Sequence, residues 1–269
     1  MADPPENAPY EATPIAAAGS LPKPVLPGTV VVRESVEELI DAIAADLFFQ
    51  AKACVRTFGD FHLALSGGTT PEPLYRRLMY DPTYRELPWK RTHLWIVDER
   101  RVPADDERSN FRMIRDTLVD QSDIPAEQVH PIRALSPTAD SDYEAELREH
   151  LGWREKGHDR LDYVLLGMGA DGHTASLFPR SPALESRGRL VLINAGPTVT
   201  PPDRVTMTFD LLNASRFIGV MVTGEKKKPM VAAVAASRHD RRTAAELPIL
   251  GIRPLAGELR WYLDAPACP

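Results

Sequence analysis

Cysteine is scarce in this chain of 269 residues, which has only two cysteines, Cys54 and Cys268. Two thiols cannot build a zinc-ribbon framework, and their positions, one in an expected helix and one in the C-terminal tail, do not indicate a disulfide scaffold. We therefore expect a reduced, cytoplasmic protein. The sequence also lacks an apolar run long enough to cross a membrane, so no membrane association is expected.

Excess positive charge is lacking too, because the formal net charge is -6 at pH 7. This balance disfavours a general nucleic-acid binder, which neutralises phosphates with Lys and Arg. A small anionic substrate needs only a locally basic pocket. No repeat at solenoid or propeller spacing is visible, which argues against a β-propeller.

The first 27 residues are rich in Pro and Ala and have few large apolar side chains. They contain no basic region followed by an apolar one, so they do not resemble a signal peptide. We expect residues 1–27 to form a disordered or loosely attached tail, and residues 28–269 to form a single α/β domain.

Short apolar strands alternate with helices through the rest of the chain. The expected strands are Thr29–Val32, Phe61–Leu65, Thr92–Val97, Leu161–Leu166, Leu190–Ile193, Val205–Thr208 and Phe217–Val222. The expected helices follow Ser35, pass through Leu74 and Leu78, span Asn110–Leu118 and span Lys226–Ala236. This alternation predicts an open, mostly parallel, Rossmann-like sheet with helices on both faces. Functional residues in such sheets gather beyond the carboxyl ends of the strands, where four polar clusters fall.

The first cluster is the segment Ser66-Gly67-Gly68-Thr69-Thr70-Pro71, between an expected strand and an expected helix. Two glycines allow a tight turn with uncovered N–H groups, and the helix start adds the positive end of its dipole. The segment can therefore cradle an anion. It can also be an ordinary turn in which Thr69 or Thr70 caps the helix.

The second cluster is Asp98-Glu99-Arg100, directly after the strand expected at Thr92–Val97. Three consecutive charges can form a solvated loop. Alternatively, Asp98 faces a pocket and Arg100 pairs its planar guanidinium with phosphate oxygens.

The third cluster, Gly167 to Thr174, contains the letters G-x-G-x-x-G of a dinucleotide fingerprint. A dinucleotide site also needs an acidic residue at the end of the next strand, where this chain has Asn194, so the fingerprint fails in context. What remains is a glycine-rich turn that presents Asp171 and His173 where a ligand can approach closely. Most single histidines are not catalytic, but imidazole is well suited to proton transfer near neutral pH, and Asp171 is close enough in sequence to orient it.

The fourth cluster is divided between Arg204, at the start of an expected strand, and the lysines 226–228 after another strand. The lysines can be a solvated run, and for two of them we expect this. One lysine at a strand-to-helix junction can reach over a phosphate as a point charge.

These clusters, in this order, resemble the 6-phosphogluconolactonase family. The matching segments are LALSGGTTP at residues 63–71, WIVDERRVP at 95–103 with Ser109-Asn110 behind it, LLGMGADGHTASLFP at 165–179, RVTMTF at 204–209 and TGEKK at 223–227. The resemblance covers about residues 30–264. It implies hydrolysis of 6-phospho-D-glucono-1,5-lactone to 6-phosphogluconate, the second step of the oxidative pentose phosphate pathway, without a metal or an organic cofactor.

The expected mechanism uses His173 as general base on a water molecule that attacks C1. Asp171 and Asp98 complete the expected catalytic group. The expected substrate- and phosphate-binding residues are Ser66, Gly67, Gly68, Thr69, Arg100, Gly172, Arg204 and Lys227. We expect a monomer or weak homodimer whose partner is the phosphorylated lactone, and no nucleic-acid partner.

Two other functions stay open from the sequence. A related aminosugar-phosphate deaminase or isomerase carries similar elements, but its histidine is typically followed by Asn-Glu-Pro, whose Glu serves ring opening. Here Thr174 to Pro179 contains no carboxylate. A non-enzymatic sugar-phosphate sensor is the second alternative, although the N-terminal tail lacks the helical periodicity of a DNA-binding module.

Overall fold

A computed structural model describes residues 21–152, 154–157, 159–196, 199–237 and 241–269. Seven strands form the main sheet, in the order β1-β10-β9-β6-β2-β3-β5, and every neighbouring pair is parallel. Their bounds are β1 Thr29–Arg33, β2 Phe61–Leu65, β3 Thr92–Ile96, β5 Val129–His130, β6 Tyr163–Gly167, β9 Phe217–Val222 and β10 Glu258–Asp264. All residues of β2 and β9 are buried, as expected for strands covered on both faces.

The strand order reverses between β2 and β6, which are neighbours near the middle of the sheet. From β2 the chain continues outward to β3 and β5, whereas from β6 it continues in the opposite direction to β9 and β10. The loops that follow β2 and β6 therefore diverge. An open α/β sheet binds its ligands in the crevice that such a reversal leaves at the carboxyl ends of the strands.

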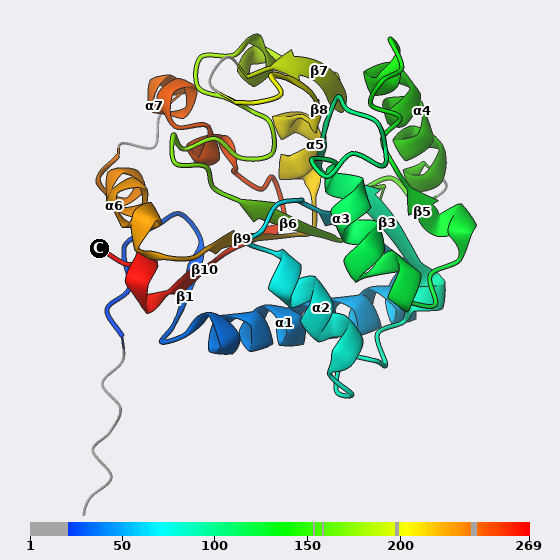
Figure 1. Ribbon diagram of the computed structural model, residues 1–269, viewed down its shortest axis with the longest axis horizontal. Helices are drawn as coiled ribbons and strands as arrows, with labels where there is room; N and C mark the ends of the chain where they lie inside the picture. The colour runs from blue at the N-terminus through cyan, green and yellow to red at the C-terminus, as the bar shows by residue number, and fades with distance from the viewer. Residues whose placement is uncertain (1–20, 153, 158, 197–198, 238–240) are drawn as a thin grey trace, which may run out of the picture.

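Helices cover both faces of the sheet, as predicted, with α1 and α2 on one side and α4 and α5 on the other (Figure 1). The helices are α1 Val36–Phe58, α2 Glu72–Tyr80, α3 Asn110–Thr117, α4 Ala139–Leu151, α5 Phe209–Ala214, α6 Lys228–Ala236 and α7 Arg241–Glu246. Short 3-10 turns span Trp89–Arg91, Val119–Gln121, Ala126–Gln128, Pro182–Glu185, Glu225–Lys227, Pro248–Gly251 and Ala265–Ala267. Among the described residues, no helix combines the length and apolar character that a membrane span requires.

The longest helix, α1, begins where the sequence predicts. Ser35 is its N-cap, and the Ser35 hydroxyl accepts a hydrogen bond from the backbone N–H of Glu38 at 3.2 Å. The Glu38 carboxylate accepts from the N–H of Glu34 at 3.2 Å rather than from that of Ser35, so the reciprocal half of the predicted capping box is displaced by one residue.

Three strands form a second, antiparallel sheet in the order β4-β8-β7, with bounds Asp98–Arg100, Asp203–Met207 and Val191–Ala195. The expected strands near residues 190–193 and 205–208 exist, but they belong to this small sheet. The charged segment 98–100, for which a solvated loop was one of two readings, is also a strand. Its three charged side chains give no strand signal in the sequence. The segment is a strand because pairing with β8 supplies its backbone hydrogen bonds.

Neither α4 nor β10 is among the elements expected from the sequence. The β10 strand lies between β1 and β9, and in α4 the side chains of Tyr143 and Leu147 are buried. Tyr143 joins the edge of the sheet through its hydroxyl, which accepts from the N–H of Ile96 at 2.8 Å. Many charged residues surround the few buried positions of α4, which hides its apolar face in the sequence.

Packing begins before the expected domain boundary at residue 28. Leu26 is buried, and the Trp261 indole donates a hydrogen bond to the Pro27 carbonyl at 2.8 Å. The expected tail falls partly on residues 1–20, which lie outside the described residues, so that part of the boundary stays a prediction.

Two truncations separate the tail from the packed segment. Removal of residues 1–20 is expected to leave the melting temperature unchanged, because their composition supplies little for a packed element. Removal of residues 1–27 also removes the buried Leu26 and exposes the apolar surface that it covers. This exposure should lower the melting temperature by about 4–8 °C. Calorimetry of both chains makes the comparison, and equal melting temperatures would show that Leu26 and Pro27 contribute nothing.

Candidate active site

A cavity of about 370 Å³ lies beyond the carboxyl ends of β2, β6 and β9, at the reversal of strand order. The loops after these strands and the strand β4 supply its walls. Of the expected site residues, those that line it are Ser66, Gly67, Gly68, Thr69, Asp98, Arg100, His173 and Lys227. The first cluster lines the cavity in full, the second and third line it in part, and Lys227 lines it from the fourth.

The loop 66–71 is held in place from behind. Its Ser66 hydroxyl donates to the Leu165 carbonyl at 2.8 Å, and the Tyr75 hydroxyl donates to the Ser66 carbonyl at 2.6 Å. Ser66 thus uses its own proton to connect β2 with β6. Gly68 has φ +98°, and a Cβ at Gly68 would meet no atom within 4 Å, which places open space beside this backbone.

The helix α2 begins without a side-chain cap. Its N-cap residue is Pro71, and no side chain in the described part of the chain caps its first turn. The expectation, within the alternative reading of this loop, that Thr69 or Thr70 caps the helix is therefore wrong. The uncapped N–H groups and the positive end of the helix dipole leave this start suited to a bound anion.

His173 and Asp171 form a directed pair on the loop after β6. The His173 Nδ1 atom lies 2.5 Å from Asp171 Oδ1, and the same oxygen accepts from the His173 backbone N–H at 3.1 Å. Because an ionised carboxylate only accepts hydrogen bonds, Nδ1 carries the proton in neutral His173 and Nε2 is left as a base. Burial opposes ionisation of Asp171, but the His173 imidazole and N–H groups outweigh it and lower the pKa of the carboxyl.

Gly169 makes room for this pair, a role that the sequence analysis did not assign. A Cβ at Gly169 would lie 2.1 Å from His173 Nδ1 and 2.7 Å from Asp171 Oδ1. Contacts this short cannot be accommodated without displacing the imidazole. The second glycine of the misleading G-x-G-x-x-G match is thus required by the histidine, not by a dinucleotide.

Asp98 is buried at the cavity wall and fixed from two sides. Ser176 Oγ donates to Asp98 Oδ2 at 2.5 Å, and Asn110 Nδ2 donates to the Asp98 carbonyl at 2.7 Å. Asn110 lines the cavity, and its Oδ1 has no hydrogen-bond partner among the described residues. A Cβ at Gly67 would lie 2.0 Å from this oxygen, so Gly67 permits the approach of Asn110.

Glu99 faces away from the cavity and anchors α3. Its carboxylate accepts from the backbone N–H groups of Asn110 and Phe111 at 2.7 and 2.8 Å and from the Ser109 hydroxyl at 3.0 Å. Burial raises the pKa of Glu99, and the hydrogen bonds only partly offset this effect. The sequence analysis missed Asn110, Ser176 and Glu99 as contributors, although Ser109-Asn110 stood within a matching segment.

The basic side chains of the second and fourth clusters lie in different surroundings. Lys227 Nζ donates to the Met168 carbonyl at 2.6 Å, and burial lowers the pKa of this lysine. Lys226 and Lys228 are exposed, as expected for a solvated pair. Arg100 lines the cavity and donates to the Arg108 carbonyl at 2.6 Å.

Arg204 is not among the residues that line the cavity, and it lies beside Arg100, which does line it. It pairs with Arg100 across β4 and β8, is buried, and donates to the carbonyls of Pro201 and Asp203. Burial, together with the charge of Arg100, lowers its pKa.

The two remaining expected site residues act from within the loop after β6. Asp171 is behind the imidazole of His173. Gly172, at φ +81°, accepts from the N–H of Ile249 at 2.9 Å, and a Cβ there would lie 2.8 Å from Leu247. Gly172 therefore shapes the turn that carries His173.

This chain is similar in sequence and in fold to known proteins. A family model described as glucosamine-6-phosphate isomerases/6-phosphogluconolactonase matches residues 34–261. The chain is 38% identical over 231 residues to the GDH/6PGL endoplasmic bifunctional protein of Homo sapiens, a match that covers 85% of this chain. It spans 28% of the length of that relative and of its rabbit counterpart.

Shorter relatives match over nearly their whole length. A 6-phosphogluconolactonase of Nostoc sp. is 37% identical over 245 residues, which cover 88% of this chain and 98% of that protein. The crystal structure of a 6-phosphogluconolactonase from Thermotoga maritima has a TM-score of 0.73 at 28% identity and covers 88% of this chain and 99% of that one. The fold class predicted from the sequence is confirmed, and the chain belongs to the glucosamine-6-phosphate isomerase/6-phosphogluconolactonase family.

Proposed function

We propose that this protein hydrolyses 6-phospho-D-glucono-1,5-lactone to 6-phosphogluconate, the second step of the oxidative pentose phosphate pathway. One observation carries the proposal: the base His173, oriented by Asp171, lines the same cavity as Arg100, Lys227 and the loop 66–71. A general base and an anion site thus face one space. Relatives named 6-phosphogluconolactonase, at up to 40% identity, support the same reaction.

The anion site would hold the phosphate. Arg100 and Lys227 supply positive charge, and Gly67, Gly68 and Thr69 supply backbone N–H groups next to the uncapped start of α2. Arg204 would act through Arg100, which it faces across the small sheet. Binding energy from the phosphate, remote from the reacting carbon, would fix C1 of the lactone against the attacking water.

The base would act at the other end of the substrate. His173 Nε2 takes a proton from water as the water oxygen bonds to C1, and a tetrahedral oxyanion forms. Asp171 stabilises the resulting imidazolium. Collapse of the intermediate breaks the bond between C1 and the ring oxygen, which takes the proton from His173. Nearby positive charge and N–H groups would stabilise the oxyanion, and Asp98 and Asn110 are placed to bind sugar hydroxyls.

Replacement of the base tests this mechanism. His173→Ala should lower turnover by about 10²-fold or more, because general base catalysis is lost. Asp171→Asn should also lower turnover, by a smaller factor, because the imidazolium loses its carboxylate. Initial rates above the spontaneous hydrolysis of the lactone give both values, and thermal melting shows whether the variants stay folded. Near-normal turnover of folded His173→Ala would remove this residue from the mechanism.

Neighbouring lysines provide a matched test of the anion site. Lys227→Met should weaken binding of 6-phosphogluconate by about 10- to 150-fold, which corresponds to loss of one charge-assisted contact of ~1.5–3 kcal/mol. Arg100→Met should have a similar effect. The exposed neighbour Lys226→Met is the control and should bind as the parent does. Calorimetric titration makes the comparison, and equal affinity of Lys227→Met and Lys226→Met would contradict the assignment.

The family also contains aminosugar-phosphate isomerases, so the reaction has to be separated from deamination. Ring opening in the deaminase uses a carboxylate after the histidine. Here the corresponding region holds Ser176, which is buried and donates to Asp98. No carboxylate in segment 174–179 is available to open a sugar ring.

We therefore expect no ammonia release from glucosamine 6-phosphate, even at high enzyme concentration. The same preparation should hydrolyse the phosphorylated lactone, generated in situ, faster than its spontaneous decay and with no loss of rate in a chelator. Ammonia release combined with lactone decay at only the spontaneous rate would reverse the assignment. Inhibition by the chelator would keep the reaction but replace histidine-activated water with metal-activated water. A cytoplasmic location and a monomeric or weakly dimeric state stay predictions.

A further inference from the structure

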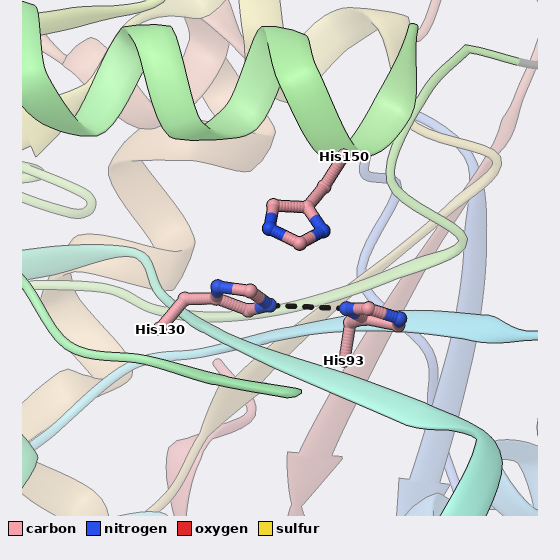
Figure 2. A group of neighbouring side chains, drawn as sticks. All are labelled: His93, His130 and His150. Atoms are coloured by element: carbon pink, nitrogen blue, oxygen red, sulfur yellow. Dashed lines mark hydrogen bonds between the residues drawn. The ribbon is translucent and has the colours of Figure 1, made fainter. Parts of the chain in front are cut away.

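A second cluster of titratable side chains lies at the edge of the sheet, away from the cavity. His93 is the second residue of β3, and His130 ends the neighbouring short strand β5. His150 comes from the last turn of α4, and its ring lies over the contact between the other two (Figure 2). One nitrogen from each of the three rings lies within 4.8 Å of the others.

The spacing of these nitrogens is close to that of a metal site. His93 Nδ1 and His130 Nε2 are 3.0 Å apart. Two nitrogens bound to a tetrahedral Zn²⁺ at ~2.0–2.1 Å lie about 3.4 Å apart. An increase of a few tenths of an ångström in the distance between the two nitrogens would therefore convert this hydrogen-bonded pair into two ligands.

Glu146 orients His130 as metal ligands are commonly oriented. His130 Nδ1 lies 2.6 Å from Glu146 Oε1. The carboxylate accepts the hydrogen bond from Nδ1–H, so Nε2 of neutral His130 carries a lone pair, which accepts the hydrogen bond from His93 Nδ1. A carboxylate behind the second ring nitrogen fixes the tautomer of a ligating histidine and raises its basicity.

His150 is the third ligand in this set, and its imidazole has no hydrogen bond to another described residue. Its ring centroid is 4.6 Å from that of His130 and 5.3 Å from that of His93. His93 and His150 are only partly buried, which leaves an entry path for an ion. Burial and the neighbouring histidines lower the pKa of His93 to about 3 and also lower that of His150, against the opposite effects of Asp60, Glu146 and Glu149. Neutral rings are the form that binds metals.

Both ring nitrogens of His62, which stacks on His93, face other partners. His62 Nδ1 accepts from the Trp95 indole at 3.0 Å, and its Nε2 lies 3.4 Å from the buried Asp60 carboxylate. His62 therefore packs against His93 without joining its ligand set.

We propose that His93, His130 and His150 form a binding site for a divalent transition-metal ion of the zinc class, with Glu146 as the outer partner of His130. Three imidazoles suit Zn²⁺, Co²⁺ or Ni²⁺, and water completes the coordination. On binding, His93 moves its proton from Nδ1 to Nε2 and Nδ1 bonds to the metal. The ion would link the end of α4 to β3 and to the edge strand β5. This site does not depend on the proposed lactonase activity.

Zinc affinity of the full chain without a histidine tag tests the proposal. We expect one Zn²⁺ per chain in competition titrations with a chromophoric chelator, and Co²⁺ absorption bands typical of nitrogen ligands. At free zinc ~100 times the dissociation constant, the melting temperature should rise by about 5–10 °C. Glu146→Gln should weaken binding by about 10- to 100-fold.

Two histidine variants locate the ion. His150→Asn should lose more affinity than Glu146→Gln while its melting temperature without metal stays close to that of the parent, because the partly buried His150 side chain loses only ring contacts and no side-chain hydrogen bond to a described residue. His173→Asn removes a histidine from the active-site cavity and should keep the parent affinity for zinc. Parent-like zinc binding by His150→Asn, loss of binding by His173→Asn, or no binding to the parent would each overturn the proposal.

Discussion

The reversal of strand order between β2 and β6 is the constraint on which the rest of the site depends. Two parallel strands lie side by side, but the chain leaves them in opposite directions, so the loops after them cannot cover each other. The hydroxyl of Ser66 bonds the Leu165 carbonyl and holds the two strands together where the loops separate. The cavity is the space left by this separation, and each strand end contributes one chemical component to it.

Close contacts then determine the positions of individual groups. Only glycine at position 169 leaves room for the His173–Asp171 pair. Likewise, only glycine at position 67 leaves room for the side chain of Asn110. These glycines lie on two different loops, yet both provide space for a polar side chain at the cavity. A carboxylate behind the imidazole then selects which nitrogen acts as base. Orientation in this site comes from packing against backbone as much as from hydrogen bonds.

The two ends of the sheet carry different chemistry. At the carboxyl ends, a base and an anion site share one cavity, and flexible cationic side chains are held by backbone carbonyls. Toward the amino end of β3, histidines from neighbouring strands stack on one another and on Trp95. An ion bound among His93, His130 and His150 would stabilise the edge of the sheet without entering the catalytic cavity.

The sequence by itself determined the elements whose signal is local. Continuous apolar runs predicted β2 and β9 to the residue, and the Ser35 cap predicted the start of α1. The polar clusters that follow strands predicted that His173 and Lys227 lie at the same end of the sheet, where both line the cavity. Only the tertiary structure decided features that depend on distant partners. Segment 98–100 became a strand because β8 pairs with it, and that pairing placed Arg204 beside Arg100, outside the set of residues that line the cavity. Asn110 and Ser176 were assigned to the site by their contacts with Asp98, at positions 12 and 78 residues away along the chain. Periodicity reports which face of an element is buried, but it carries no information about which strand or side chain covers that face.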